Sequence, residues 1–209
     1  MEISEILQFL ISNKGLELFG LITGLLYLYL EYKANIWLWP VGVIMPIVYI
    51  IIFYQNKFYA DMTFNVYYLF ASIYGWYIWA KSIEKTEQGL ISHLPKKYIA
   101  SLTAIFVAIF AVIAFLLINF TDSEVPYGDS FTTALSILAM WMLAHKYIEQ
   151  WLLWIVVNAV TAVLYNSKEL NITMVLFVVN FFVSILGYVK WKKMMEEQHA
   201  SQEAVLPVD

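Results

Sequence analysis

The sequence predicts an all-α integral membrane protein, and its composition is the first reason. Of its 209 residues, 62% are hydrophobic, whereas soluble domains contain roughly 45–50% apolar residues. Only 13% are charged, and the mean hydropathy is +0.70. A water-soluble core cannot enclose so much apolar surface. The apolar runs are also too long, and alternate too little, for the strands of a membrane barrel.

Seven transmembrane helices are expected from the apolar runs, because each crossing needs about 20 apolar residues. Residues 1–15 are expected to form a short interfacial helix, since they lack the basic start and cleavage site of a signal peptide. Residues 194–209 form a polar tail that we expect to be disordered. The predicted spans are 18–33, 37–55, 60–80, 97–120, 129–145, 149–166 and 170–191.

The placement of the lysines predicts the orientation of these spans. Lysines concentrate on the cytoplasmic side of membrane proteins. If the N-terminus lies outside, nine of the lysines face the cytoplasm and only Lys14, Lys57 and Lys168 face outward. The sequence therefore predicts an external N-terminus and a cytoplasmic C-terminus.

An internal repeat accounts for six of the seven spans. Residues 70–79, FASIYGWYIW, recur at 182–191 as FVSILGYVKW, and the same offset of 112 pairs Trp39 with Trp151. We predict repeat 1 at 16–81, a linker with the fourth span at 82–128, and repeat 2 at 129–193. Because the two copies begin four crossings apart, they run in the same direction. This 3+1+3 parallel repeat is the arrangement of SWEET-like transporters.

Polar and aromatic side chains recur along single faces of several spans and predict a substrate site. Asn158 is the clearest case, because an amide in hydrocarbon is costly unless it is bonded. Pro46 interrupts the second span, where it is either a simple kink or a gating hinge. The predicted substrate-binding residues are Trp154, Asn158, Asn65, Tyr68, Tyr49, Met45, Trp151, Thr161 and Asn180.

Other small and aromatic residues have a structural interpretation of equal or greater weight. Small and hydroxyl residues are enriched where membrane helices touch, which suits Ser72, Gly75, Ser184 and Gly187 as well as a substrate role does. Tryptophans near span ends typically belong to the aromatic belt at the membrane surface. We assign Trp39, Trp79 and Trp191 to that belt.

Several classes of function are excluded by what the sequence does not contain. No ionisable residue lies near the middle of a span, which argues against a proton relay or an ion-coupled pump. The three histidines are scattered, cysteine is absent, and no nucleotide-binding or hydrolase motif occurs. With a net charge of −4 and no basic run, nucleic-acid binding is not expected. We expect no enzyme, no cofactor and no metal, and instead the passage of a small molecule through the lipid bilayer.

Four segments resemble the PnuC family of bacterial vitamin transporters. They are NIWLWPVG at 35–42, KFYADM at 57–62, YGWYIW at 74–79, and the W-x-x-W-x-x-x-N pattern at 151–158. The resemblance spans about residues 16–193. It implies a SWEET-like fold in the bacterial inner membrane and facilitated diffusion of a vitamin. It further implies trapping of that vitamin by a cytoplasmic kinase or pyrophosphokinase, and it is compatible with a homo-oligomer.

The substrate is expected to be a cationic B-type vitamin, with thiamine favoured over nicotinamide riboside. Nicotinamide riboside members of the family tend to carry Asn where this chain has Met45, and Gln where it has Asn65. The stretch 57–68 looks more like the thiamine-transporting PnuT branch. The alternative is a nicotinamide riboside transporter of the same family. A non-transporting membrane sensor or assembly subunit is a second alternative.

Overall fold

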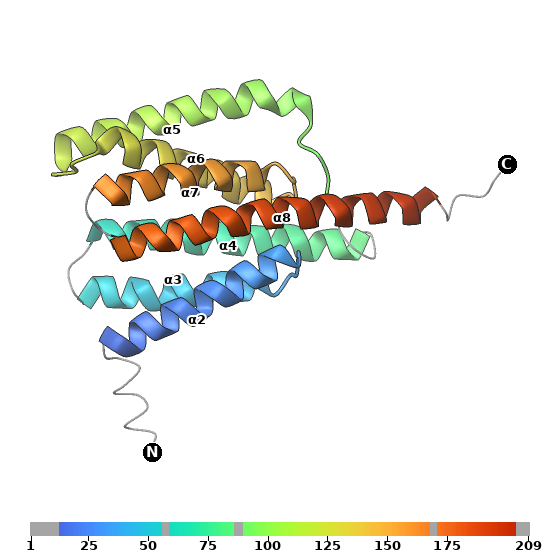
Figure 1. The fold of residues 1–209 in the computed structure, drawn as a ribbon, viewed down its shortest axis with the longest axis horizontal. Helices are drawn as coiled ribbons and strands as arrows, with labels where there is room; N and C mark the ends of the chain where they lie inside the picture. The colour runs from blue at the N-terminus through green and yellow to red at the C-terminus, as the bar shows by residue number, and fades with distance from the viewer. Residues whose placement is uncertain (1–12, 56–58, 86–89, 168–170, 204–209) are drawn as a thin grey trace, which may run out of the picture. The chain divides into compact units, whose positions relative to one another are not determined.

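The computed structural model describes residues 13–55, 59–85, 90–167 and 171–203 (Figure 1). Within these ranges the chain forms seven long α-helices, one for each predicted span, so the all-α fold is confirmed. Residues 1–12 of the expected interfacial helix lie outside the described residues. The helices are α2 (Asn13–Tyr32), α3 (Leu38–Gln55), α4 (Tyr59–Lys85), α5 (Ile99–Phe120), α6 (Pro126–Ala144), α7 (Gln150–Ser167) and α8 (Asn171–Glu203).

The predicted disordered tail is wrong over residues 194–203, because α8 continues to Glu203. The reason is local: Met, Glu and Gln, which dominate this stretch, are good helix formers. The stretch is also held in place, since Met195 is only 7% exposed. In addition, the amide oxygen of Gln198 accepts a 3.0 Å hydrogen bond from the backbone N–H of Ile91.

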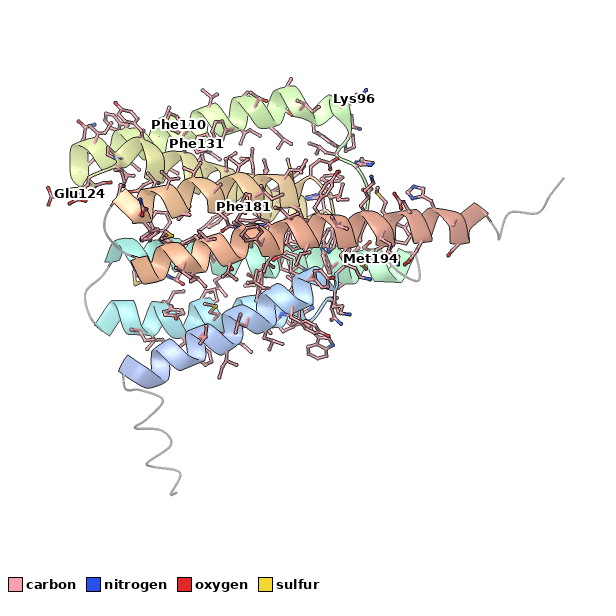
Figure 2. All side chains as sticks on the ribbon, in the orientation of Figure 1. Lys96, Phe110, Glu124, Phe131, Phe181 and Met194 are labelled. Atoms are coloured by element: carbon pink, nitrogen blue, oxygen red, sulfur yellow. The ribbon has the colours of Figure 1, made fainter. Side chains whose placement is uncertain are left out.

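The chain divides into two compact units, residues Met1–Lys81 and Ser82–Asp209. In the first unit, α2 packs on α3. In the second, α5, α6, α7 and α8 pack in chain order, each helix against the next (Figure 1). Aromatic side chains lie between α5 and α6: Phe106 and Phe131 meet edge to face with ring centroids 5.7 Å apart, and Figure 2 labels Phe110 and Phe131 in this region. An apolar cavity of about 270 Å³ opens along the same seam.

Both units contain the same packing motif of two tryptophans and a glycine. The rings of Trp39 and Trp79 meet edge to face, with centroids 5.5 Å apart and an interplanar angle of 82°. Trp151 and Trp191 repeat this geometry at 5.8 Å and 84°. The first ring of each pair lies directly over a glycine, Gly75 in one unit and Gly187 in the other. The internal repeat is therefore present in the packing as well as in the sequence.

The assignment of Trp39, Trp79 and Trp191 to an interfacial belt is wrong. All three are buried, with exposed fractions of 0–1%. The glycine one turn before Trp79, and again one turn before Trp191, opens a slot that admits the partner indole. Close helix contact at glycine is a general feature of membrane helices. These tryptophans are thus part of the helix packing.

The turn between the first two helices of each repeat is also duplicated. Ala34 and Lys146 both adopt a positive φ, 49° and 54°, a conformation that L-residues adopt only at some cost. Their backbone N–H groups bond the carbonyls of Glu31 and Leu143 at 2.9 and 3.0 Å. The following residues bond back to Leu30 and Met142, both at 2.9 Å. Matching hydrogen bonds thus end the first helix of each repeat.

The segment 92–94 holds the second of these turns through hydrogen bonds. The backbone N–H of Ser92 donates to the carbonyl of Lys146 at 3.1 Å, and the N–H of Ile148 donates to the carbonyl of Ser92 at 3.0 Å. The Glu149 carboxylate accepts the N–H of Leu94 at 2.8 Å. These bonds fix the start of α7, where the first residues of the W-x-x-W-x-x-x-N pattern lie.

We predict that Ala34→Gly and Lys146→Gly each stabilise the protein, because glycine adopts a positive φ without steric cost. The backbone contribution to this gain is expected to be about 1 kcal/mol in the free energy of unfolding for each variant, measurable as a higher Tm in detergent. An unchanged or lower Tm for both variants would contradict the strain argument.

Lys146 adds a pH dependence to this pair. Burial lowers the pKa of its amine from 10.5 to about 8. Between these values the unfolded chain binds more protons than the folded one, so the stability of the unmodified protein rises with pH. The advantage of Lys146→Gly should therefore shrink between pH 8 and 10.5, whereas that of Ala34→Gly should not.

Candidate functional site

The predicted polar face of α7 is largely buried, and part of it packs against α8. Trp151 and Asn158 face α8: the Trp151 ring packs on Gly187 and Trp191, and Asn158 bonds Ser184. The opposite side of α7 is apolar and exposed, as the sequence pattern predicts. Its most exposed residues are Leu152, Val156 and Val163.

Asn158 is part of a hydrogen-bonded chain between α7 and α8. Its side-chain NH₂ donates to the hydroxyl of Ser184 at 3.1 Å, and that hydroxyl donates to the backbone carbonyl of Asn180 at 2.8 Å. Asn158 and Ser184 are 7% and 3% exposed. An asparagine amide has two N–H donors and an oxygen acceptor. This bond therefore uses one donor and leaves capacity for a substrate.

Trp154 and Thr161 are two further predicted site residues of this face. Trp154 is half-buried, and its indole N–H has no hydrogen-bond partner among the described residues. Thr161 is 9% exposed. Trp151 also has an indole N–H without a partner in the part of the chain that the structure describes. Its ring packs on Gly187 and Trp191, and its role as a substrate contact stays a prediction.

The first unit holds the other predicted site residues on α3 and α4. The Tyr49 hydroxyl lies over Gly20 of α2, where no side chain intervenes. Tyr68 is 38% exposed, and Met45 and Asn65 are half-buried. Pro46 is buried within a helix that continues on both sides of it. Its role as a hinge stays a prediction.

Two buried polar residues were missed by sequence reasoning. Glu31, within the first predicted span, is only 3% exposed. Gln150, near the start of the sixth predicted span, is the first residue of α7 and is fully buried. A comparison of the two repeats could have found Gln150, because its counterpart at the same offset is the apolar Leu38.

The chemistry of this face is uncharged, aromatic and amide-rich. Indole and phenol rings attract organic cations through their π-systems, by about 1–2 kcal/mol per ring where water is excluded. Amides and hydroxyls supply donors and acceptors without a net charge. Among the described residues, no group of His, Cys, Asp or Glu could hold a metal ion. The face therefore suits recognition of a flat polar molecule.

A duplicated bundle of apolar helices with buried amide and aromatic faces defines a multi-pass membrane transporter. The family model described as "Nicotinamide mononucleotide transporter" matches residues 14–193. The chain belongs to this family, to which the PnuC transporters also belong.

Individual relatives support the same class. The nicotinamide riboside transporter PnuC of Escherichia coli K12 is 26% identical over 201 residues, covering 84% of each chain. Its counterpart from Neisseria mucosa is also 26% identical, covering 87% of this chain and 73% of its own. The riboflavin/roseoflavin transporter RibM of Streptomyces davaonensis is 26% identical over 151 residues, 69% of this chain and 68% of its own.

A solved structure shares the fold. The structure described as the crystal structure of the vitamin B3 transporter PnuC aligns with a TM-score of 0.69 at 24% identity. It covers 92% of this chain and 87% of its own. The predicted seven-helix transporter fold is thereby confirmed, and the relatives named above are transporters, in line with the expectation that the chain is not an enzyme.

Proposed function

We propose that this protein carries nicotinamide riboside across the bacterial inner membrane by facilitated diffusion. The observation that carries the proposal is the near full-length similarity to two transporters named for that substrate. The uncharged aromatic and amide face of α7 fits a cationic pyridinium ring with a carboxamide and ribose hydroxyls. The residues proposed to contact it are those predicted from the sequence.

The preference for thiamine that the sequence predicts is not supported by these relatives, none of which is named for thiamine. The argument from Met45 and Asn65 concerned single positions of the first unit. Those positions can alter affinity without changing the class of substrate. Thiamine therefore becomes the second candidate, and a competition experiment decides between the two.

We predict that nicotinamide riboside binds the purified protein at least tenfold more tightly than thiamine. A site built to bond a substrate's polar groups discriminates strongly, because any unmade hydrogen bond in it is costly. Competition titrations with both compounds and riboflavin give the ratio. Met45→Asn should strengthen riboside binding if residue 45 contacts the substrate. A thiamine preference in the unmodified protein would overturn the proposal.

We predict that transport is not coupled to a proton or sodium gradient, because no span carries an ionisable group near its middle. Sealed vesicles should then equilibrate nicotinamide riboside without accumulating it. Accumulation should appear only when a riboside kinase and ATP are enclosed, since phosphorylation traps the product. Gradient-driven accumulation in the absence of the kinase would contradict this mechanism.

The proposed topology places the N-terminus outside and the C-terminus in the cytoplasm. Lysine placement supports it, because most lysines then face the cytoplasm. In this orientation α8 ends on the kinase side of the membrane. Labelling of a cysteine introduced near each terminus, in intact cells and in inverted vesicles, tests the orientation directly.

A further inference from the structure

The two repeats differ at three successive turns of one helix face. Position 38 of α3 corresponds to 150 of α7, position 42 to 154, and position 46 to 158. Residues four apart lie on the same side of a helix. In α3 these positions hold apolar or small residues: Leu38, Gly42 and Pro46. In α7 they hold hydrogen-bonding side chains: Gln150, Trp154 and Asn158.

The packing motif around this face is the same in both copies. The tryptophan pairs, the glycines beneath them and the helix-ending turns superimpose in their geometry, as described above. The residues just before the tryptophans, Leu38 and Gln150, both begin a helix and are both 0% exposed. The first repeat therefore shows what this local fold requires at that position, which is a buried apolar side chain.

Gln150 departs from that requirement at a cost. Neither its amide nitrogen nor its amide oxygen has a hydrogen-bond partner within the described ranges. Buried polar groups are nearly always paired, and an unpaired one destabilises the fold. The side-chain amide of Gln150 is also not needed to begin α7, because the backbone N–H of Gln150 donates to the carbonyl of Tyr147 at 3.2 Å.

We propose that Gln150 is a substrate-contacting residue that completes a recognition face with Trp154 and Asn158. The inference rests on the proposed transport function and extends it to a residue outside the W-x-x-W-x-x-x-N pattern. A carboxamide side chain offers donors and an acceptor side by side. It is the natural partner for a substrate group with the same pair, such as the carboxamide of a nicotinamide or the aminopyrimidine edge of thiamine. The Trp154 indole N–H, one turn away and also unpaired, supplies a second donor.

The test is to give the second repeat the residue of the first, Gln150→Leu, with Gln150→Met as an unbranched variant of similar length. Affinity for nicotinamide riboside, thiamine and riboflavin is measured by calorimetry, and Tm by thermal unfolding in the same detergent. We expect at least tenfold weaker binding of the preferred ligand, about 1.4 kcal/mol, together with an equal or higher Tm. Loss of function with gained stability is not expected of a residue that only supports the fold.

Leu38→Gln is the matched control, because it places an amide at the equivalent position of the first repeat. It should lower the Tm and change the affinity by less than twofold. Unchanged affinity in Gln150→Leu, or a Tm that falls as it does in Leu38→Gln, would overturn the inference. A result in which affinity is unchanged and only transport slows would assign Gln150 to a conformational step and would overturn substrate contact. If the unmodified protein binds thiamine but not the riboside, the proposed function fails, while the same variants measured with thiamine still test Gln150.

Discussion

Gly187→Ala is expected to destabilise the protein by about 1–3 kcal/mol, the range for overpacking a tight contact. A Cβ at this position would lie 2.6–2.7 Å from three ring atoms of Trp151, and real contacts do not come so close. The indole cannot move aside easily, because it is 1% exposed and its ring packs edge to face on Trp191. The expected drop in Tm is roughly 3–10 °C for a chain of this size.

Gly75→Ala should have the same effect in the first repeat, where the built Cβ overlaps the ring of Trp39. Gly24→Ala is the matched control, since no other side chain lies within 4 Å of its added Cβ. Replacing a helical glycine by alanine in open space gains about 0.5–1 kcal/mol. Thermal unfolding of the three variants checks the prediction. Similar Tm values for Gly24→Ala and Gly187→Ala would show that the tryptophan slots are not close-packed.

The helices and the repeat could be predicted because both depend on properties that a sequence displays directly. Run length and hydropathy locate a membrane helix, and identities at a constant offset locate a duplication. The tail of α8 could not be found this way. Its helix is mixed in polarity and is held by particular contacts, such as the bond between Gln198 and Ile91.

The roles of the tryptophans were harder to predict from the sequence, because a tryptophan at the end of a span can occupy either of two environments. A tryptophan at a span end can face the membrane surface or a slot above a glycine. The sequence shows that the spacing Gly75–Trp79 is repeated as Gly187–Trp191. It does not show that each glycine makes room for the indole ring of another tryptophan. Trp151 shows the same ambiguity within the site: its place in the pattern predicts a substrate contact, whereas its ring is used in packing.

For Asn158 the question is whether its amide serves helix packing or substrate binding. The amide donates a hydrogen bond to Ser184 of α8, and we propose that it also bonds the substrate. Asn158→Leu should weaken substrate binding strongly while leaving a folded protein. Leucine is well tolerated in a span, so only the amide is lost. Each hydrogen bond lost in a desolvated pocket costs about 1–3 kcal/mol. Two such bonds would weaken nicotinamide riboside binding by roughly 30-fold or more, which a titration detects.

Ser184→Ala separates the structural contribution of Asn158 from the substrate contact. It removes the 3.1 Å bond between α7 and α8 but keeps the Asn158 amide in place. Interhelical hydrogen bonds in membranes average about 0.6 kcal/mol, so both variants should lower the Tm slightly and to a similar extent. Only Asn158→Leu should then lose binding. If Asn158→Leu binds normally with a lower Tm, the amide serves helix packing alone. If Ser184→Ala loses binding equally, the bond to Ser184 must orient the amide toward the substrate, and the two residues then act as one unit.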